Sequence, residues 1–285
     1  MIDYHVHPNY SIDAQGTLEE FCLSALWANL REICFTTHLD SEPTSSDGYV
    51  VVNGKRRGVL DNRWLEDYES KVRGAADSFK ERGLTVLLGV EVDYFPGVAE
   101  ALPDRFHDTG FDMIMGSVHL IDRMQITTEP EAQNAFAKLS IQQLGDRYYE
   151  LLTECAETGL FNVLGHMDVY RRYGEKFYGA DIHSIWLPHV KQLAASMKRH
   201  HVGFEVNTSP WRRGMEQPMP ETSIIKAMRK AGIKTVTIGS DAHNPNDVGA
   251  GVEKALSLIK ECGFSSPSRF REERAIPLSI EPTRK

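Results

Sequence analysis

The chain has 285 residues, 41% of them hydrophobic, and a net charge of −8, an ordinary composition for a globular protein. This composition excludes a disordered or collagen-like chain, and the net negative charge argues against a general nucleic-acid binder, which would carry a basic surface. The sequence contains no apolar run of the ~18 residues needed to cross a bilayer, and its N-terminus lacks the basic and apolar regions of a signal peptide. The four cysteines form no CxxC pair. We therefore expect reduced, buried thiols and a cytoplasmic protein.

Short β-rich runs alternate with longer amphipathic stretches along most of the chain. The predicted strands are Ile2–His7, Ile33–His38, Val86–Asp93, Met113–Leu120, Asn162–Asp168, Gly203–Ser209 and Thr235–Asp241. The predicted helices are one that begins with the capping box Thr17-Leu-Glu-Glu20, and then Asp61–Arg82, Ile141–Thr158, Ile182–His201 and Thr222–Ala231. This alternation predicts βαβ units around a parallel sheet. We expect an α/β fold in a single domain over residues 1–285, with a closed or nearly closed barrel. An open doubly wound sheet is the alternative, but no GxGxxG or Walker motif supports its nucleotide-binding form.

Two segments interrupt this alternation. Ser41–Leu60 is a long loop after the second predicted strand, and Asn53-Gly54 within it predicts a hairpin turn. Leu120–Phe136 is a similar loop after the fourth strand. Loops of this length are often lids or binding loops. A short strand-like segment, Ala275–Ile280, lies near the end of the chain.

Histidines and carboxylates recur at or just after the ends of the predicted strands. Six of the eleven histidines lie there together with two acidic residues, and the full set is His5, His7, His38, Glu91, His119, His166, Asp241 and His243. In parallel barrels the active site is built at the C-terminal ends of the strands, so these distant residues are expected to converge.

The residue types in this set are suited to binding metal. Imidazole binds Zn, Fe or Mn ions, and carboxylates complete or bridge their coordination. Because strand side chains alternate with a period of two, His5 and His7 project from the same face and can hold one ion. Asp241 and His243 repeat that spacing. Eight candidate ligands exceed the needs of one tetrahedral ion, so we expect two or three divalent ions.

Taken together, these motifs resemble the PHP (polymerase and histidinol phosphatase) superfamily of metal-dependent phosphoesterases. The motifs are His5-Val-His7, Thr37-His38, Gly165-His166-Met-Asp168 and Ser240-Asp241-Ala-His243, with Glu91 and His119 between them. The similarity runs from Ile2 to about Leu258 and is greatest to the histidinol-phosphate phosphatase branch. It implies a distorted (β/α)7 TIM-like barrel with a trinuclear metal site at the C-terminal face of the strands.

The resemblance also implies how the ligands are shared among the ions. One ion would take His5, His7, Glu91 and Asp241. A second would share Glu91 and add His119 and His166, and a third would take Asp13, His38 and His243. From the residues alone, Asp13 reads as a turn residue. Asp168 is a candidate partner for a ligating histidine.

The implied reaction is hydrolysis of a small phosphate monoester, L-histidinol phosphate above all, by a metal-bridging hydroxide that attacks phosphorus in line. Arg171 is the candidate phosphate ligand, because its guanidinium offers two parallel donors, while adjacent Arg172 fits a solvated charge. Asp241 and His243 are candidates for supplying the proton to the leaving alkoxide, although metal ligation limits both. Candidates for binding the rest of the substrate are Asn207, Ser209, Glu42, Asp47, Asp93 and Tyr94.

Three alternatives remain open from the sequence. The first is another PHP phosphoesterase, acting on nucleotides or phosphodiesters. The second is an amidohydrolase-like enzyme, a class that also opens with HxH but relies on a carboxylated lysine where this chain has Glu91. The third is a metal-binding protein without catalytic activity. If the protein is such an enzyme, we expect it to act on a small molecule and to have neither a nucleic-acid nor a membrane partner.

Overall fold

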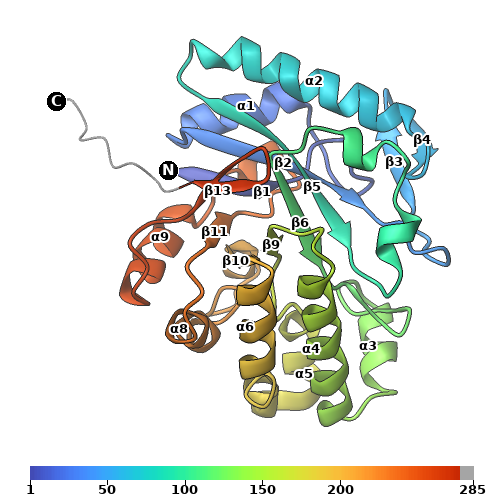
Figure 1. Ribbon diagram of the computed structural model, residues 1–285, viewed down its shortest axis with the longest axis vertical. Helices are drawn as coiled ribbons and strands as arrows, with labels where there is room; N and C mark the ends of the chain where they lie inside the picture. Colours follow the sequence, from blue (N-terminus) through green and yellow to red (C-terminus); the bar gives the residue numbers. More distant parts are fainter. Residues whose placement is uncertain (277–285) are drawn as a thin grey trace.

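Seven parallel strands form the central sheet of the computed structural model, in which residues 1–276 are described (Figure 1). Their order in the sheet is β1 (Ile2–Val6), β2 (Glu32–Leu39), β5 (Thr85–Asp93), β6 (Met113–Ser117), β9 (Val163–Leu164), β10 (Gly203–Asn207) and β11 (Val236–Gly239). Every predicted strand overlaps one of these. Sequence order and sheet order coincide for these strands, as expected for successive βαβ units.

The first and last strands of the sheet meet and nearly close it into a barrel. Val6 and Ala242 form an isolated parallel bridge, and the Asp241 backbone N–H donates to the His5 carbonyl over 2.7 Å. A Cβ on Gly239 would lie 2.3 Å from the Cβ of His5, so glycine is required for this approach. The prediction of a distorted TIM-like barrel is confirmed, and the open doubly wound sheet is excluded.

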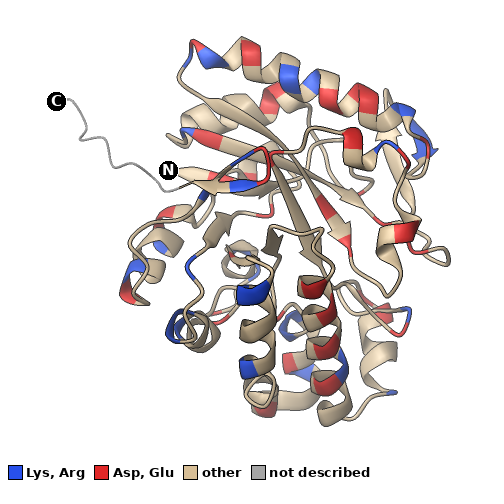
Figure 2. Cartoon of the chain, viewed as in Figure 1, with Lys and Arg blue, Asp and Glu red and all other residues tan. Residues whose placement is uncertain are grey.

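Helices cover the outside of the barrel. They are α1 (Leu18–Trp27), α2 (Arg63–Lys80), α3 (Glu131–Phe136), α4 (Ile141–Glu157), α5 (Arg171–Tyr178), α6 (Val190–Arg199), α7 (Ser209–Arg212), α8 (Thr222–Lys230) and α9 (Val252–Glu261). The capping box predicted at Thr17 and Glu20 is present at the start of α1. Figure 2 shows charged residues spread over the outer helices, whereas the central strands carry few of them. The charge pattern thus marks the solvent-facing side of each helix.

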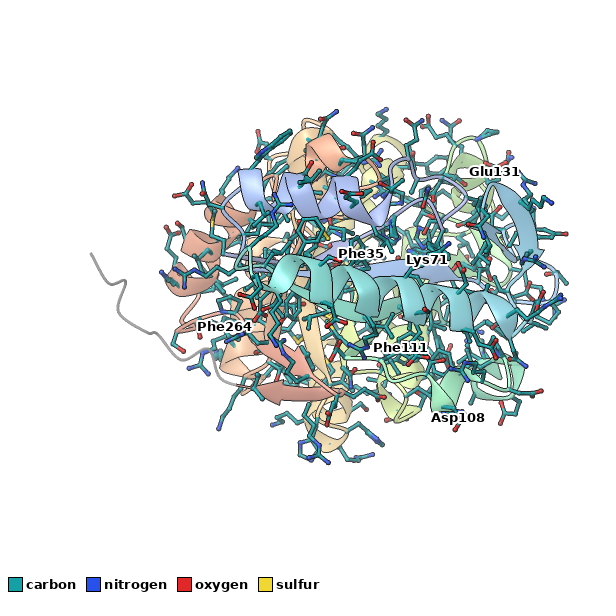
Figure 3. The ribbon with its side chains drawn as sticks, turned by 90° about the horizontal axis from the view of Figure 1, so that it is seen from above. Phe35, Lys71, Asp108, Phe111, Glu131 and Phe264 are labelled. Carbon is teal, nitrogen blue, oxygen red and sulfur yellow. The ribbon has the colours of Figure 1, made fainter. Side chains whose placement is uncertain are left out.

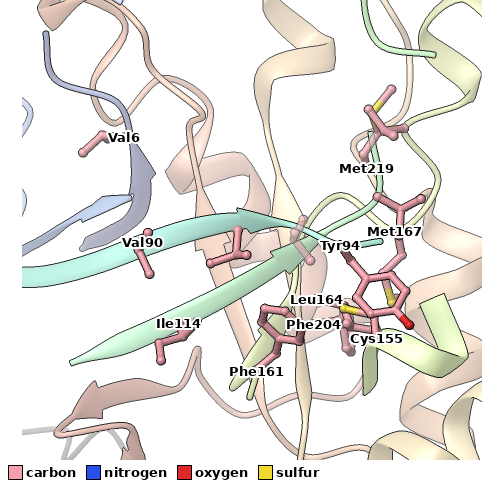
Figure 4. Packing of buried hydrophobic residues seen from close by; sticks show 14 of the residues in the cluster. Val6, Val90, Tyr94, Ile114, Cys155, Phe161, Leu164, Met167, Phe204 and Met219 are labelled. Atoms are coloured by element: carbon pink, nitrogen blue, oxygen red, sulfur yellow. The ribbon is translucent and has the colours of Figure 1, made fainter. Parts of the chain in front are cut away.

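The main apolar core lies between the sheet and the helices. Val90, Ile114, Leu164 and Phe204 contribute to it from neighbouring strands, and Cys155 meets them from α4 (Figure 4). Phe35 of β2 packs edge-on against Phe21 of α1, and Figure 3 labels Phe35 between α1 and α2. Apolar residues on every strand of the sheet belong to these contacts, so the helices hold the barrel in shape from outside.

The segments that connect the strands agree in part with those predicted from the sequence. The Asn53-Gly54 hairpin is confirmed between β3 (Tyr49–Val52) and β4 (Lys55–Gly58), with both turn residues at positive φ. The Leu120–Phe136 loop contains a second hairpin, β7 (Leu120–Ile121) with β8 (Met124–Gln125), and then α3.

The helix predicted over Ile182–His201 is wrong in its first half. A 3-10 helix covers Gly179–Ser184, and α6 begins only at Val190. Pro188 lies between them, and proline disfavours helical backbone in the residue before it and lacks an N–H.

The N-terminal end of the barrel is closed by a separate apolar cluster. This floor cluster contains Ile2, Tyr4, Cys34, Leu87, Met113, Met115, Val163 and Phe270. Phe270 belongs to the C-terminal hairpin of β12 (Arg269–Arg271) and β13 (Arg274–Ile276), so part of the predicted Ala275–Ile280 strand is confirmed. Residues 277–280 of that prediction lie outside the described residues. Leu87 and Glu91 of β5 share a face, because they are four residues apart. The floor cluster therefore lies below the strand-end residues inside the same barrel.

Phe270→Ala is expected to lower the free energy of unfolding by about 3–5 kcal/mol, because it removes a buried ring and leaves a cavity. Urea denaturation followed by circular dichroism measures the change. Trp27→Ala is the matched control, since Trp27 is 83% exposed and should change the stability by less than about 0.5 kcal/mol. Equal losses in the two variants would contradict a role for Phe270 in closing the barrel floor.

Candidate metal centre

Four buried ligand atoms lie close together above the floor cluster and form the first cage. They are Nε2 of His5, Nε2 of His7, Oε2 of Glu91 and Oδ1 of Asp241, and His–carboxylate separations among them are 3.3–3.7 Å. An ion with four bonds of about 2.0–2.2 Å places its ligand atoms about 3.3–3.6 Å apart. Three of the atoms, on His5, His7 and Glu91, are buried and have no hydrogen-bond partner in the described part of the chain. A cation at the centre would supply the missing partner.

The second cage shares Glu91 with the first. Its Oε1 atom lies 3.0 Å from Nε2 of His166 and 3.7 Å from Nε2 of His119, and the two histidine nitrogens are 3.2 Å apart. The two oxygens of Glu91 therefore face different cages. This is the arrangement of a carboxylate that bridges two ions.

The third cage is the most exposed. Nε2 of His243 lies 3.3 Å from Nε2 of His38 and 3.2 Å from Oδ2 of Asp13, and His38 lies 3.8 Å from the other Asp13 oxygen. The Asp13 side chain is 55% exposed and reaches the cage from the segment after β1. Asp13 therefore lies where the family resemblance placed it. All nine residues predicted to bind metal come together at the C-terminal ends of the strands.

Local backbone features bring the first and last strands to this centre. The pairing of β1 with β2 is irregular between Asp3 and Val6, so Tyr4 packs in the floor cluster while His5 and His7 both reach the first cage. Asp241 has a φ of +55°, which is uncommon for a residue other than glycine and typical of strained functional positions. Its carbonyl accepts from the Arg212 guanidinium over 3.1 Å, which helps to hold this conformation.

The electrostatics of the cages keep the carboxylates charged and divide the histidines. Burial lowers the pKa of His5 and of His38, but neighbouring carboxylates outweigh it and raise the pKa of His5 well above 6.5 and that of His38 to about 10. Burial raises the pKa of Glu91, but His5, His166 and His38 outweigh it and hold that pKa well below its usual range. Burial likewise raises the pKa of Asp241, and the neighbouring histidines bring it well below the ordinary value. Burial lowers the pKa of His7 well below 6.5, and the nearby His38 and His243 act in the same direction. The carboxylates are thus charged and His7 is neutral, which are the states that bind metal.

Two carboxylates outside the cages bind the ring nitrogens of His5 and His119 that point away from the cage centres. Nδ1 of His5 donates to Glu205 over 2.7 Å, and Nδ1 of His119 donates to Asp93. Sequence reasoning did not identify Glu205. The available signal was an acidic residue in the middle of an otherwise uncharged strand, Gly203–Asn207. Asp168, predicted for such a role, instead accepts from Arg171 and from the Glu221 backbone.

The structure does not place Arg171 or Asn207 at the cavity. Arg171 is 1% exposed, and its guanidinium donates to Asp168 over 2.7 Å and to the Pro218 carbonyl. Asn207 is fully buried. Its amide N–H donates to Glu205, and its amide oxygen accepts from the Ser209 backbone N–H. Arg171 points away from the cavity because of its position at the start of α5. Successive helical residues point about 100° apart, so only its neighbour Arg172 faces the cages.

A cavity of about 710 Å³ opens over the cages. Arg172, Arg212 and Arg213 line it, together with Asp40, Asp47 and Asp93. Glu42 and Tyr94 line a smaller neighbouring cavity. A volume of this size suits a small molecule, and cations beside arginines suit an anionic group.

A nearly closed parallel barrel with adjoining metal cages at its C-terminal face and an arginine-lined cavity defines a metal-dependent hydrolase. The chain belongs to the PHP domain family, whose model matches residues 3–209. It is 28% identical over 277 residues to a Deinococcus radiodurans protein named "Probable histidinol-phosphatase", covering 97% of this chain and 99% of that one. It is 25% identical over 278 residues to the histidinol-phosphatase of Lactococcus lactis, covering 94% of each.

Solved structures give the same fold. The histidinol phosphate phosphatase of Lactococcus lactis, solved with zinc, L-histidinol and phosphate, superposes with a TM-score of 0.75 at 19% identity, over 97% of this chain and 98% of that one. A Listeria monocytogenes protein of the same type superposes with a TM-score of 0.72 at 19% identity, over 89% and 99% of the two chains. The predicted family is confirmed, and the amidohydrolase-like alternative is set aside. Within residues 1–276, none of the helices has the length and apolar character needed to span a membrane.

Proposed function

We propose that the protein hydrolyses L-histidinol phosphate to L-histidinol and phosphate, a step of histidine biosynthesis. The observation that carries the proposal is a cavity that joins the three cages to the guanidinium groups of Arg172, Arg212 and Arg213. Relatives matched along 93% or more of this chain bear the name histidinol-phosphatase, which supports this substrate. We further propose that residues 1–285 act as one cytoplasmic domain on this small molecule, with neither a nucleic-acid nor a membrane partner.

The nine ligands of the three cages would hold divalent ions such as Zn, Mn or Fe. When bound, such ions lower the pKa of a coordinated water and neutralise the charge on the phosphate oxygens. The protein itself supplies Glu91 between two cages and the buried setting that strengthens these interactions.

Arg172 is the side chain best placed to orient the phosphate. Among residues 1–276, its buried Nε atom has no hydrogen-bond partner, and its nearest carboxylate, Asp241, is 3.8 Å away. Burial and then the neighbouring Arg213 lower the pKa of Arg172. Two adjacent guanidinium groups facing one cavity are favourable once an anion lies between them. We propose Arg172 and Arg213 as the phosphate-binding pair in place of Arg171.

The other end of the substrate would meet acidic side chains. Asp40, Asp47 and Asp93 line the same cavity and suit the ammonium and imidazole of histidinol. His243 lies at the mouth of the cavity with 28% of its side chain exposed, and with Asp241 it stays the candidate for passing a proton to the leaving alkoxide.

Phosphate release from L-histidinol phosphate, measured beside nucleoside monophosphates and a phosphodiester, tests the proposal. The purified protein is assayed as isolated, after chelation and after Zn²⁺, Mn²⁺ or Fe²⁺ is added back. We expect metal-restored activity with a kcat/KM for histidinol phosphate well above that for the other esters. Preference for a nucleotide or a diester would move the function to another phosphoesterase of the family. Bound metal with no turnover of any ester would overturn the phosphatase assignment.

A further inference from the structure

Glu205 on β10 is a fully buried carboxylate beside the first cage, and it does not belong to any of the cages. Its Oε1 atom accepts from Nδ1 of His5 over 2.7 Å. Its Oε2 atom accepts from the backbone N–H of His166 over 3.0 Å and from the Asn207 amide over 3.3 Å. Both oxygens are therefore engaged away from the cage centres.

These contacts link ligands of two different cages. His5 belongs to the first cage and His166 to the second. By accepting the Nδ1 proton, Glu205 fixes the His5 tautomer and ring orientation, so that the Nε2 lone pair points into the first cage. By accepting the His166 N–H, it fixes the turn after β9 from which that ligand projects. We propose that Glu205 is a positioning residue that sets the metal affinity of the first and second cages.

The surrounding chain is shaped to hold this carboxylate. A Cβ on Gly239 would lie 2.2 Å from Oε1 of Glu205, so the missing side chain on β11 leaves the space that the carboxylate occupies. The same glycine allows β11 to approach His5. The site of Glu205 is therefore built by the strand contact that closes the barrel.

The charge of Glu205 supports the same role. Within the described residues, no lysine or arginine nitrogen lies within 4.0 Å of its carboxylate, and His5 is its only ionisable basic partner. A buried anion is costly unless cations compensate it. With Glu91 and Asp241 also buried nearby, ions held in the cages would supply the compensating charge. The inference rests on the metal binding in the proposed function and is independent of the substrate.

The test compares Glu205→Gln with Glu32→Gln in the full chain. Glu32 is the matched control, because it is 2% exposed and lies at the other end of the barrel, where Arg269, Arg271 and Tyr4 bind it. The dissociation constants for Zn²⁺ are measured by competition with a chromophoric chelator at constant pH. Glutamine fills the same space but offers only one acceptor for the two sites on His5 and His166. We expect about a 10–100-fold weaker Zn²⁺ affinity in Glu205→Gln and an unchanged affinity in Glu32→Gln. Equal affinities in Glu205→Gln and the parent protein would overturn the proposal.

A second measurement needs no variant and decides the case if Glu205→Gln does not fold. In the Zn²⁺-loaded parent protein labelled with ¹⁵N-histidine, His5 should be protonated at Nδ1, with a strongly deshielded proton. A proton on Nε2 of His5 would overturn the proposal. Neither measurement uses histidinol phosphate, so a failure of the substrate assignment remains distinguishable from a failure of this inference.

Discussion

Glu91→Gln is expected to empty two metal cages and to lower kcat/KM by more than about 100-fold. This loss exceeds the usual effect of removing a residue that only hydrogen-bonds a metal ligand. The reason is that the two oxygens of Glu91 face different cages, with Oε2 3.3 Å from His5 and Oε1 3.0 Å from His166. Glutamine keeps the shape but replaces one of the two anionic oxygens by an amide group, which is a poor ligand for a transition-metal ion. Metal content by mass spectrometry and steady-state phosphate release measure the two effects.

Asp13→Asn supplies the comparison for Glu91→Gln. Asp13 contributes to the third cage alone, and more than half of its side chain is exposed. We expect this variant to lose affinity at one ion and to keep the metal of the other two cages. If Glu91→Gln retained as much metal as the parent protein, Glu91 would not be a bridging ligand, and the division into three cages would have to be redrawn.

The metal centre was largely predictable because its ligands lie at the ends of strands. A strand end fixes both the place and the side of a residue, since parallel strands finish at one face and side chains alternate along them. His5, His7, Glu91 and His166 follow this rule, and the structure brings them together. The irregular pairing in β1 did not disturb the prediction. The register shift lies between Asp3 and Val6, and both His5 and His7 still reach Glu91.

The residues that support the centre were harder to predict. Arg171 and Arg172 differ by one helical position, and the sequence does not say at what angle α5 leaves β9. Glu205 lies two residues before the end of its strand, as Glu91 does, but its role depends on the space that Gly239 leaves on the neighbouring strand. Such features arise from contacts between distant segments, which local patterns do not encode.

Substitution of Arg171 is expected to lower the stability of the protein, whereas substitution of its neighbour Arg172 is expected to lower its activity. Arg171→Met should lower the free energy of unfolding by about 3–5 kcal/mol, because it leaves the fully buried Asp168 carboxylate without its charge partner. Arg172→Met should keep most of the stability, because the nearest carboxylate to Arg172 is 3.8 Å away. It should instead lower kcat/KM for histidinol phosphate by roughly 10- to 150-fold, the value of a lost charge-assisted hydrogen bond of about 1.5–3 kcal/mol.

Urea denaturation and steady-state kinetics on both variants measure these changes, with activity corrected for the folded fraction. Methionine preserves the apolar length of the side chain, so the comparison isolates the guanidinium. In Arg171→Met the corrected kcat/KM should stay within a few-fold of the parent value, because Arg171 contacts Asp168 and Pro218 rather than the cavity. A stable Arg171→Met protein with a large loss of kcat/KM would restore the sequence-based assignment of Arg171 as the phosphate ligand. It would also require α5 to turn in the substrate complex, because Arg172 faces the cages in this structure.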